Sequence, residues 1–283
     1  MTKIVVGVDA SDESKAALEW ARQHAPADAR IIAVHAWDVP LVAGYEAAVA
    51  IDPLELEGAA STFLRDVTAE IGDPRVEAVL AQGHPGRSLV EAANDADMVV
   101  VGHRGSGKAS IILGSTVNYV LHHTERPVVV IRGERFGPAR RVVVGVDDHG
   151  VEDGAGENPS VRALRWAYQL PGVEEIAVMH AWFAPAVAAG VFASAGADME
   201  QMDLAASEVI EHVMRAAGPM PSGITLSRVA ERGTPGFALI EASRSADLIV
   251  VGSRGRGGFA ELLLGSTSLE VAAHSHSPVV VIR

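Results

Sequence analysis

Val-Val-Val-Gly-His-Arg-Gly at residues 99–105 is the stretch that decides the fold, because most of it recurs as Val-Val-Gly-Ser-Arg-Gly at residues 250–255. Each copy is an apolar, β-branched run that stops at glycine, which indicates a buried strand entering a loop. Leu-Gly-Ser-Thr follows each loop, at residues 113–116 and 264–267, and indicates the start of a helix. Backbone N–H groups of such a loop and helix N-terminus can surround a phosphate. Each copy is therefore interpreted as a phosphate site for a nucleotide.

The repeat extends over the whole chain of 283 residues, a length that suits two domains with a core each. We predict domains at residues 1–138 and 139–283. In each, five short apolar runs are separated by helical patterns. Runs that are apolar throughout, with no polar residue at every second position, indicate parallel strands covered on both faces. The sequence predicts an α/β fold of two tandem, doubly wound, Rossmann-like parallel sheets, each with five strands in the order 3-2-1-4-5. The third strands, which alternate more, are expected at the edge, and long helices are expected at residues 55–71 and 199–217.

The first strand of each half is predicted to end in a carboxylate, Asp9 or Asp147. In the predicted strand order this end lies beside the glycine loop after the fourth strand, so two motifs far apart in the sequence meet in one crevice. Ser11 and Asn158 are expected to cap the helices that follow.

The two halves differ between the first strand and the first helix. Trp20 and Trp166 are 146 residues apart, whereas Asp9 and Asp147 are 138 apart, so the second half carries eight extra residues there. That insertion is expected to lie beside the second crevice.

Composition excludes several classes of protein. Lysine and arginine number 23 against 36 aspartates and glutamates, and the net charge of −13 disfavours a nucleic-acid partner. The absence of cysteine excludes disulfides and thiolate nucleophiles. No apolar run approaches the roughly 20 residues of a membrane span, and the first apolar run is too short for a signal peptide. We expect a cytoplasmic protein with neither a membrane nor a nucleic-acid partner.

The chain resembles the tandem universal stress proteins over nearly its whole length. The likeness rests on a first strand ending in Gly-Val-Asp, a Val-His-Ala second strand, a Val-Gly-x-Arg-Gly loop, and the sequences Leu-Gly-Ser-Thr and Pro-Val-Val-Val-Ile-Arg. ATP-binding members of that family have Gly, two residues, Gly, nine residues and then Gly-Ser/Thr. Nine residues separate Gly255 from Gly265, as in that pattern, whereas eight separate Gly105 from Gly114.

The resemblance implies an adenine-nucleotide site in each half, for ATP with or without magnesium. Aspartates would contact adenosine, alanines after the strand histidines would line the adenine pocket, and the glycines and hydroxyls would hold the phosphates. In the first half the implied residues are Asp9, Ala10, Ser11, Ala36, Val101, Gly102, Arg104, Gly105, Gly114, Ser115 and Thr116. In the second half they are Asp147, Ala181, Val251, Gly252, Arg254, Gly255, Gly265, Ser266 and Thr267. Because each half departs from the family pattern, we expect unequal affinities.

Three functions stay open on the sequence. The first is a stress-response regulator or sensor that binds adenine nucleotide, the second a slow ATPase in which Asp9 or Asp147 positions water or magnesium, and the third a nucleotide-free dimerisation module. Fast phosphoryl transfer is not expected, since no set of nucleophile, base and metal is evident.

A P-loop NTPase is not expected either, because Ala109 stands where that loop needs a hydroxyl. The Val-Val-Val-Ile strands are expected to be covered by pairing of the two halves or of two subunits, and a homodimer is expected. The sequence identifies no protein partner.

Several residues have simpler structural interpretations. His35 and His180 lie in apolar strands, where a hydrogen-bonded core histidine is expected rather than a ligand. The four tryptophans are expected to anchor the cores. The loop glycines are expected to allow close approach of the backbone and a positive φ, so valine at Gly105 or Gly252 should remove binding in its own half.

Overall fold

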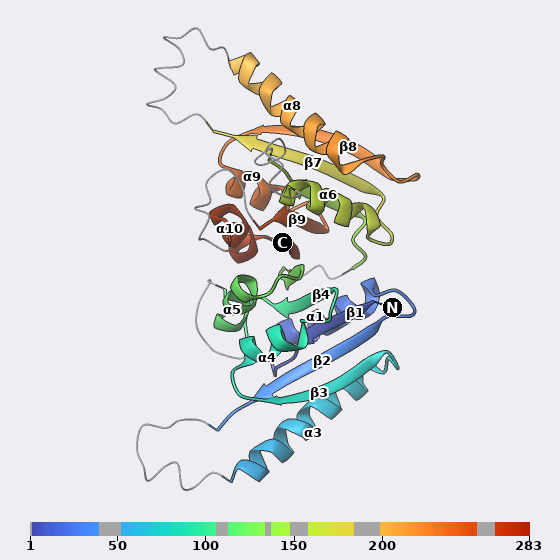
Figure 1. Ribbon diagram of the computed structural model, residues 1–283, viewed down its shortest axis with the longest axis vertical. Helices are drawn as coiled ribbons and strands as arrows, with labels where there is room; N and C mark the ends of the chain where they lie inside the picture. Colours follow the sequence, from blue (N-terminus) through green and yellow to red (C-terminus); the bar gives the residue numbers. More distant parts are fainter. Residues whose placement is uncertain are drawn as a thin grey trace, which may run out of the picture. The chain divides into compact units, whose positions relative to one another are not determined.

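A computed structural model describes residues 2–39, 52–105, 113–133, 137–147, 158–183, 199–253 and 264–283. The chain divides into two compact units, Met1–Ile131 and Arg132–Arg283, and each is described by itself (Figure 1). The division falls between the last strand of the first unit and the first strand of the second, where the described residues form neither helix nor strand.

The first unit is a five-stranded sheet with helices packed against it. Its strands are β1 (Lys3–Gly7), β2 (Arg30–Trp37), β3 (Val76–Gln82), β4 (Met98–Gly102) and β5 (Val128–Ile131). They pair in parallel in the order β3-β2-β1-β4-β5, which confirms the predicted order. Two helix pairs cover the sheet (Figure 1), formed by α1 (Asp12–His24) with α3 (Pro53–Ile71) and by α4 (Pro85–Ala92) with α5 (Ser115–His123).

The second unit repeats this architecture. Its strands β6 (Arg141–Gly145), β7 (Glu175–Trp182), β8 (Thr225–Arg232), β9 (Leu248–Gly252) and β10 (Val279–Ile282) pair in parallel in the order β8-β7-β6-β9-β10. The helices are α6 (Pro159–Gln169), α8 (Met199–Ala217), α9 (Pro235–Ala242) and α10 (Ser266–His274). Both predicted long helices are present as α3 and α8. Of the helices in the described ranges, none is long and apolar enough to cross a membrane.

Burial follows the apolar pattern of the strands. In β1 and β4, Val5 and Val100 are fully buried, as strands between two helix layers require. The third strand of each unit, β3 or β8, has several exposed residues and lies at the outer end of its sheet, as its alternating sequence predicts.

Both predicted helix caps are present. The Ser11 hydroxyl oxygen accepts a hydrogen bond from the backbone N–H of Ser14, at the start of α1. Asn158 Oδ1 accepts from the backbone N–H of Ser160 at 2.6 Å, at the start of α6. These caps supply acceptors for first-turn N–H groups that have no partner within the helix.

The interpretation of all four tryptophans as core anchors is correct only for Trp20, which is buried and stacks on His24 with 4.2 Å between ring centroids. The other three are partly exposed. Trp182 is the last residue of β7, and its Nε1 donates to Asp203 Oδ1 at 3.1 Å. An indole at a strand end can keep one polar edge accessible, which the apolar pattern of the strand does not reveal.

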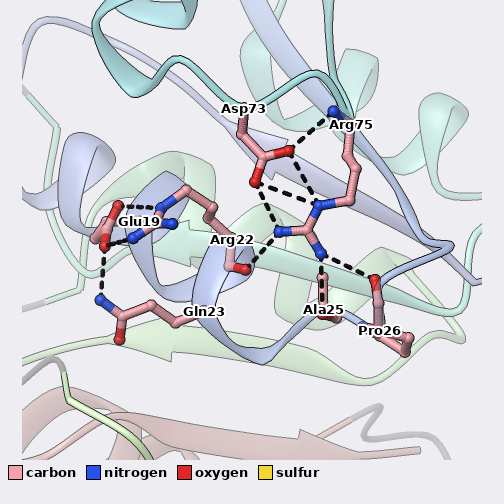
Figure 2. A network of polar contacts seen from close by, with 7 residues as sticks. All are labelled: Glu19, Arg22, Gln23, Ala25, Pro26, Asp73 and Arg75. Carbon is pink, nitrogen blue, oxygen red and sulfur yellow. Dashed lines mark hydrogen bonds and ion pairs between the residues drawn. The ribbon is translucent and has the colours of Figure 1, made fainter.

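Arg75 ties the end of α1 to the loop before β3 (Figure 2). Its Nη2 lies 2.7 Å from Oδ2 of Asp73, and its guanidinium also donates to the carbonyl oxygens of Arg22, Ala25 and Pro26 at 2.9 to 3.1 Å. Carbonyls at a helix end lack partners within the helix, so the arginine supplies their hydrogen bonds. The hydrogen bond from the Arg75 side chain lowers the pKa of Asp73 to about 2.

Candidate functional site

A cavity of about 360 Å³ opens in the first unit where β1, β2 and β4 end. β1 lies between β2 and β4, so the residues that follow these strands meet at one edge of the sheet. Nine of the eleven residues predicted for this half line the cavity: Asp9, Ala36, Val101, Gly102, Arg104, Gly105, Gly114, Ser115 and Thr116. The fold therefore brings together the strand-end carboxylate, the glycine loop and the Gly-Ser-Thr helix start.

The remaining wall consists of His35, interpreted from the sequence as a core histidine, and of residues that were not singled out there. The latter are Gly7, Val8, Ser14, Val34, Pro85, Leu89 and Val117. Pro85 and Leu89 come from α4, whose approach to the site depends on how that helix packs. A signal for it was present, because Gly-His-Pro-Gly at residues 83–86 recurs as Gly-Thr-Pro-Gly at 233–236.

Asp9 is held by the start of α1. Its Oδ1 accepts hydrogen bonds from the backbone N–H of Ser11 at 2.9 Å and from the Ser11 hydroxyl. Its own N–H donates to the Ser14 hydroxyl at 3.1 Å. Ser11 is buried and Ala10 is exposed, and neither belongs to the cavity wall. In this geometry Ser11 orients the Asp9 carboxylate instead of facing the cavity.

Both glycines of the first loop have close neighbours at the position that a Cβ atom would take. A Cβ atom on Gly102 would lie 2.8 Å from the backbone carbonyl carbon of Glu13, and a Cβ on Gly105 would lie 2.6 Å from Asp9 Oδ2. Neither glycine has a positive φ, so the expectation of left-handed backbone at Gly105 is wrong. Glycine is needed there for space, because the carboxylate of Asp9 occupies the place that a side chain would take.

Arg104 follows β4 and lines the cavity, with its side chain 46% exposed. Its Nη2 donates to Oε1 of Glu13 at 3.1 Å, and the Glu13 side chain is 26% exposed. The loop arginine is thus both a cation at the cavity and a partner of the first turn of α1.

The start of α5 forms another part of the wall. Gly114 is the N-cap residue and contributes no side-chain hydrogen bond, while its own N–H donates to the carbonyl oxygen of His103 at 3.0 Å. Ser115 and Thr116 form the first turn, beside N–H groups that a side-chain cap would otherwise engage. This end of the helix carries the positive end of its dipole.

His180 is a buried, hydrogen-bonded core histidine, as expected, whereas His35 is only partly buried and also lines the cavity. His35 Nδ1 lies 2.8 Å from the carbonyl oxygen of Val8, and His180 Nδ1 lies 2.7 Å from that of Val146. Each histidine therefore bridges the second strand of its unit to the residue before the strand-end aspartate. No cluster of three or more potential metal-ligating side chains occurs within the described ranges.

The second unit places the corresponding residues at the same strand and helix ends. Ala181 is in β7, Val251 and Gly252 end β9, and Gly265, Ser266 and Thr267 begin α10. The N–H of Gly265 donates to the carbonyl oxygen of Ser253 at 2.7 Å. A Cβ on Gly252 would lie 2.7 Å from Pro159 Cβ, and Gly252 likewise lacks a positive φ, which corrects the expectation for this glycine.

Asp147 follows β6, and its backbone N–H donates to the Ser160 hydroxyl at 2.9 Å, as that of Asp9 does to Ser14. The cap differs, since Asn158 Nδ2 donates to the Asp147 carbonyl oxygen at 3.3 Å, whereas Ser11 donates to the Asp9 carboxylate. Arg254 and Gly255 lie outside the described residues. So do residues 106–112 and 256–263 of the two glycine loops and residues 148–157, which contain most of the insertion.

Comparison with known proteins gives one consistent family. A model of the universal stress protein family matches residues 1–132 and 138–283. A universal stress protein of Mycolicibacterium smegmatis is 31% identical, with 99% of this chain and 96% of that protein covered. One of Mycobacterium tuberculosis is 29% identical with the same coverage. The crystal structure of a universal stress protein from Archaeoglobus fulgidus aligns over 99% of this chain and 98% of that one, with a TM-score of 0.67 and 23% identity, a likeness that concerns the fold alone.

Proposed function

The chain belongs to the universal stress protein family, as a tandem pair of its domains, and we propose that it binds adenine nucleotide at the carboxyl edge of each sheet. The observation that carries this proposal is the cavity of the first unit, whose wall contains both the strand-end carboxylate of Asp9 and the glycine loop after β4. Its volume of about 360 Å³ falls within the roughly 300–1,000 Å³ usual for small-molecule sites.

The chemistry of the wall suits the parts of a nucleotide. The Asp9 carboxylate, fixed through Oδ1 by Ser11, offers acceptor oxygens of the kind that bind ribose hydroxyls at a strand end. Val34 and Ala36 provide small apolar surface for a base. The first turn of α5 provides N–H groups and a hydroxyl for phosphate oxygens.

We further propose that nucleotide occupancy makes the protein a stress-response regulator or sensor in the cytoplasm, by changing its stability or the surface it presents to a partner. A homodimer stays a prediction, and so does participation of magnesium. The cavity wall holds a carboxylate but no oriented histidine–nucleophile pair among the described residues, which favours binding over rapid hydrolysis.

The experiment has two stages. The purified protein is denatured and any released nucleotide is identified by mass, and ATP is then titrated calorimetrically into the emptied, refolded protein. We expect ATP or ADP to be recovered, with up to two sites per chain. Flat titrations at millimolar ATP would reject the proposal and favour the nucleotide-free interaction module. Phosphate release that depends on Asp9 and Asp147 would instead favour the slow ATPase.

A charge variant of the α5 start tests where the phosphates lie. Ser115→Asp places a carboxylate at a helix N-terminus, where it stabilises the helix but repels a bound phosphate. We expect the first site to lose about tenfold in ATP affinity, equal to about 1.4 kcal/mol, without a fall in the melting temperature of the ligand-free protein. Ser115→Asn is the control of matched size without the charge. Equal losses from both substitutions would argue against phosphate at this helix end.

A further inference from the structure

A carboxylate stands next to the proposed phosphate end of the first site. Glu13 lies in the first turn of α1, and its Oε1 is 3.1 Å from Arg104 Nη2. The guanidinium of the glycine loop therefore forms an ion pair with a side chain of the protein itself. Glu13 itself is not part of the cavity wall, whereas Arg104 is. An anionic ligand in the cavity therefore meets an arginine whose charge is already partly balanced.

At the position that corresponds to Glu13, the second unit has a proline, Pro159. A Cβ on Gly102 would meet Glu13 at 2.8 Å, and a Cβ on Gly252 would meet Pro159 at 2.7 Å. These equivalent contacts establish that Pro159 occupies in α6 the place that Glu13 occupies in α1. A glutamate and a proline differ by one full negative charge, so the first turns of α1 and α6 differ in charge at this position.

We propose that Glu13 determines how strongly the first site prefers highly charged ligands, by retaining Arg104 in an ion pair. This inference rests on the proposed nucleotide binding. A phosphate tail competes with Glu13 for the guanidinium, so its binding is weakened by the loss of that pair. A neutral nucleoside leaves the pair intact and bears no such penalty. The first site therefore discriminates less between adenosine and ATP than it would without Glu13.

The test compares adenosine, AMP and ATP by calorimetry in the full chain and in the Glu13→Gln variant. Because the ion pair is partly exposed, we expect the ratio of ATP to adenosine affinity at the first site to rise roughly two- to five-fold in Glu13→Gln. Asp12→Asn is the matched control, since Asp12 is an exposed carboxylate in the same helical turn. The substitutions leave the second site unaltered, and its affinities serve as an internal reference.

The Arg104→Gln variant tests whether Glu13 acts through its ion pair with Arg104 or only through its negative charge near the site. In that background Glu13→Gln should leave the ratio unchanged, because there is no guanidinium to release. A ratio that rises equally with Asp12→Asn, or that still rises when Arg104 is absent, would overturn the role of Glu13. No change in Glu13→Gln while the original chain binds ATP would overturn it too. Absence of all adenine-compound binding in the original chain would reject the proposed function itself, and this inference with it.

Discussion

At the scale of single residues, the two loop glycines of the first unit lie against different neighbours. Gly102 faces the backbone of Glu13, which cannot move without shifting α1, whereas Gly105 faces the end of the Asp9 side chain. The sequence reveals that glycine is needed at both positions but not for which neighbour.

Alanine at these glycines should separate stability from binding. We expect Gly102→Ala to lower the free energy of unfolding by about 1–3 kcal/mol, as overpacking does. Gly105→Ala should change stability by less than about 1 kcal/mol but should weaken ATP binding, because it displaces the Asp9 carboxylate. Gly58→Ala, in α3 with no atom near its Cβ position, is the control and should stabilise by about 0.5–1 kcal/mol. Denaturant unfolding and calorimetry measure the two effects, and full ATP affinity in Gly105→Ala would contradict the assignment of Asp9.

Most residues of the candidate site could be predicted from the sequence because they directly follow buried strands. Asp9 and Gly102 are marked by apolar runs that end beside them, and strand order then brings them together. The pairing of Glu13 with Arg104 was not accessible in this way, because it joins residues 91 apart through side chains with no sequence period. The contribution of Leu89 was missed for a similar reason, since it depends on how α4 packs.

At the scale of elements, the two units terminate their helices differently although their strands repeat. In the first unit Arg75, from the loop before β3, binds carbonyls at the end of α1. In the second unit the donor lies in α6, where Arg165 binds the carbonyl oxygens of Ala216 and Ala217 at the end of α8. Strand order was predictable from a repeated pattern, but these arginines have no counterpart at the matching position of the other half.

The Arg75 network should give the first unit a distinct response to acid. The pKa of Asp73 is lowered to about 2 from an ordinary value of 3.8, so its contribution to stability is fully present above about pH 4 and is lost as pH falls through about 2. We expect Arg75→Met to lower the free energy of unfolding by about 1–2 kcal/mol at pH 7. Its deficit relative to the original chain should shrink between pH 4 and 2. Urea unfolding across that range checks this, with Asp73→Asn as the variant that should lack the same pH dependence while keeping the carbonyl contacts. A deficit that stays constant with pH would contradict the linkage to Asp73.

At the scale of the whole molecule, the tandem chain carries two proposed sites whose surrounding residues differ. The units share their fold, but Asp9 is held by Ser11 through its carboxylate, whereas Asn158 binds the backbone of Asp147. Glu13 and Pro159 add a difference in charge. Unequal affinities are expected from the sequence because one glycine loop is a residue shorter and the other half carries an insertion. Among the described residues, the differences between the halves lie in the cap and in the first helical turn.

Hydrogen exchange with and without ATP resolves the two sites within the intact chain. A ligand that binds only the folded state stabilises it by RT ln(1 + [L]/Kd), so we expect slower exchange at the starts of both α5 and α10. Ser115→Asp should reduce the ATP-dependent protection at α5 and leave that at α10, and Ser266→Asp should do the reverse, since the two serines begin equivalent helices. Each variant is the matched control for the other. Loss of protection at both helices from either single substitution would show that the sites are coupled and that the tandem chain acts as one switch, whereas independent losses would establish two separate sensors on one chain.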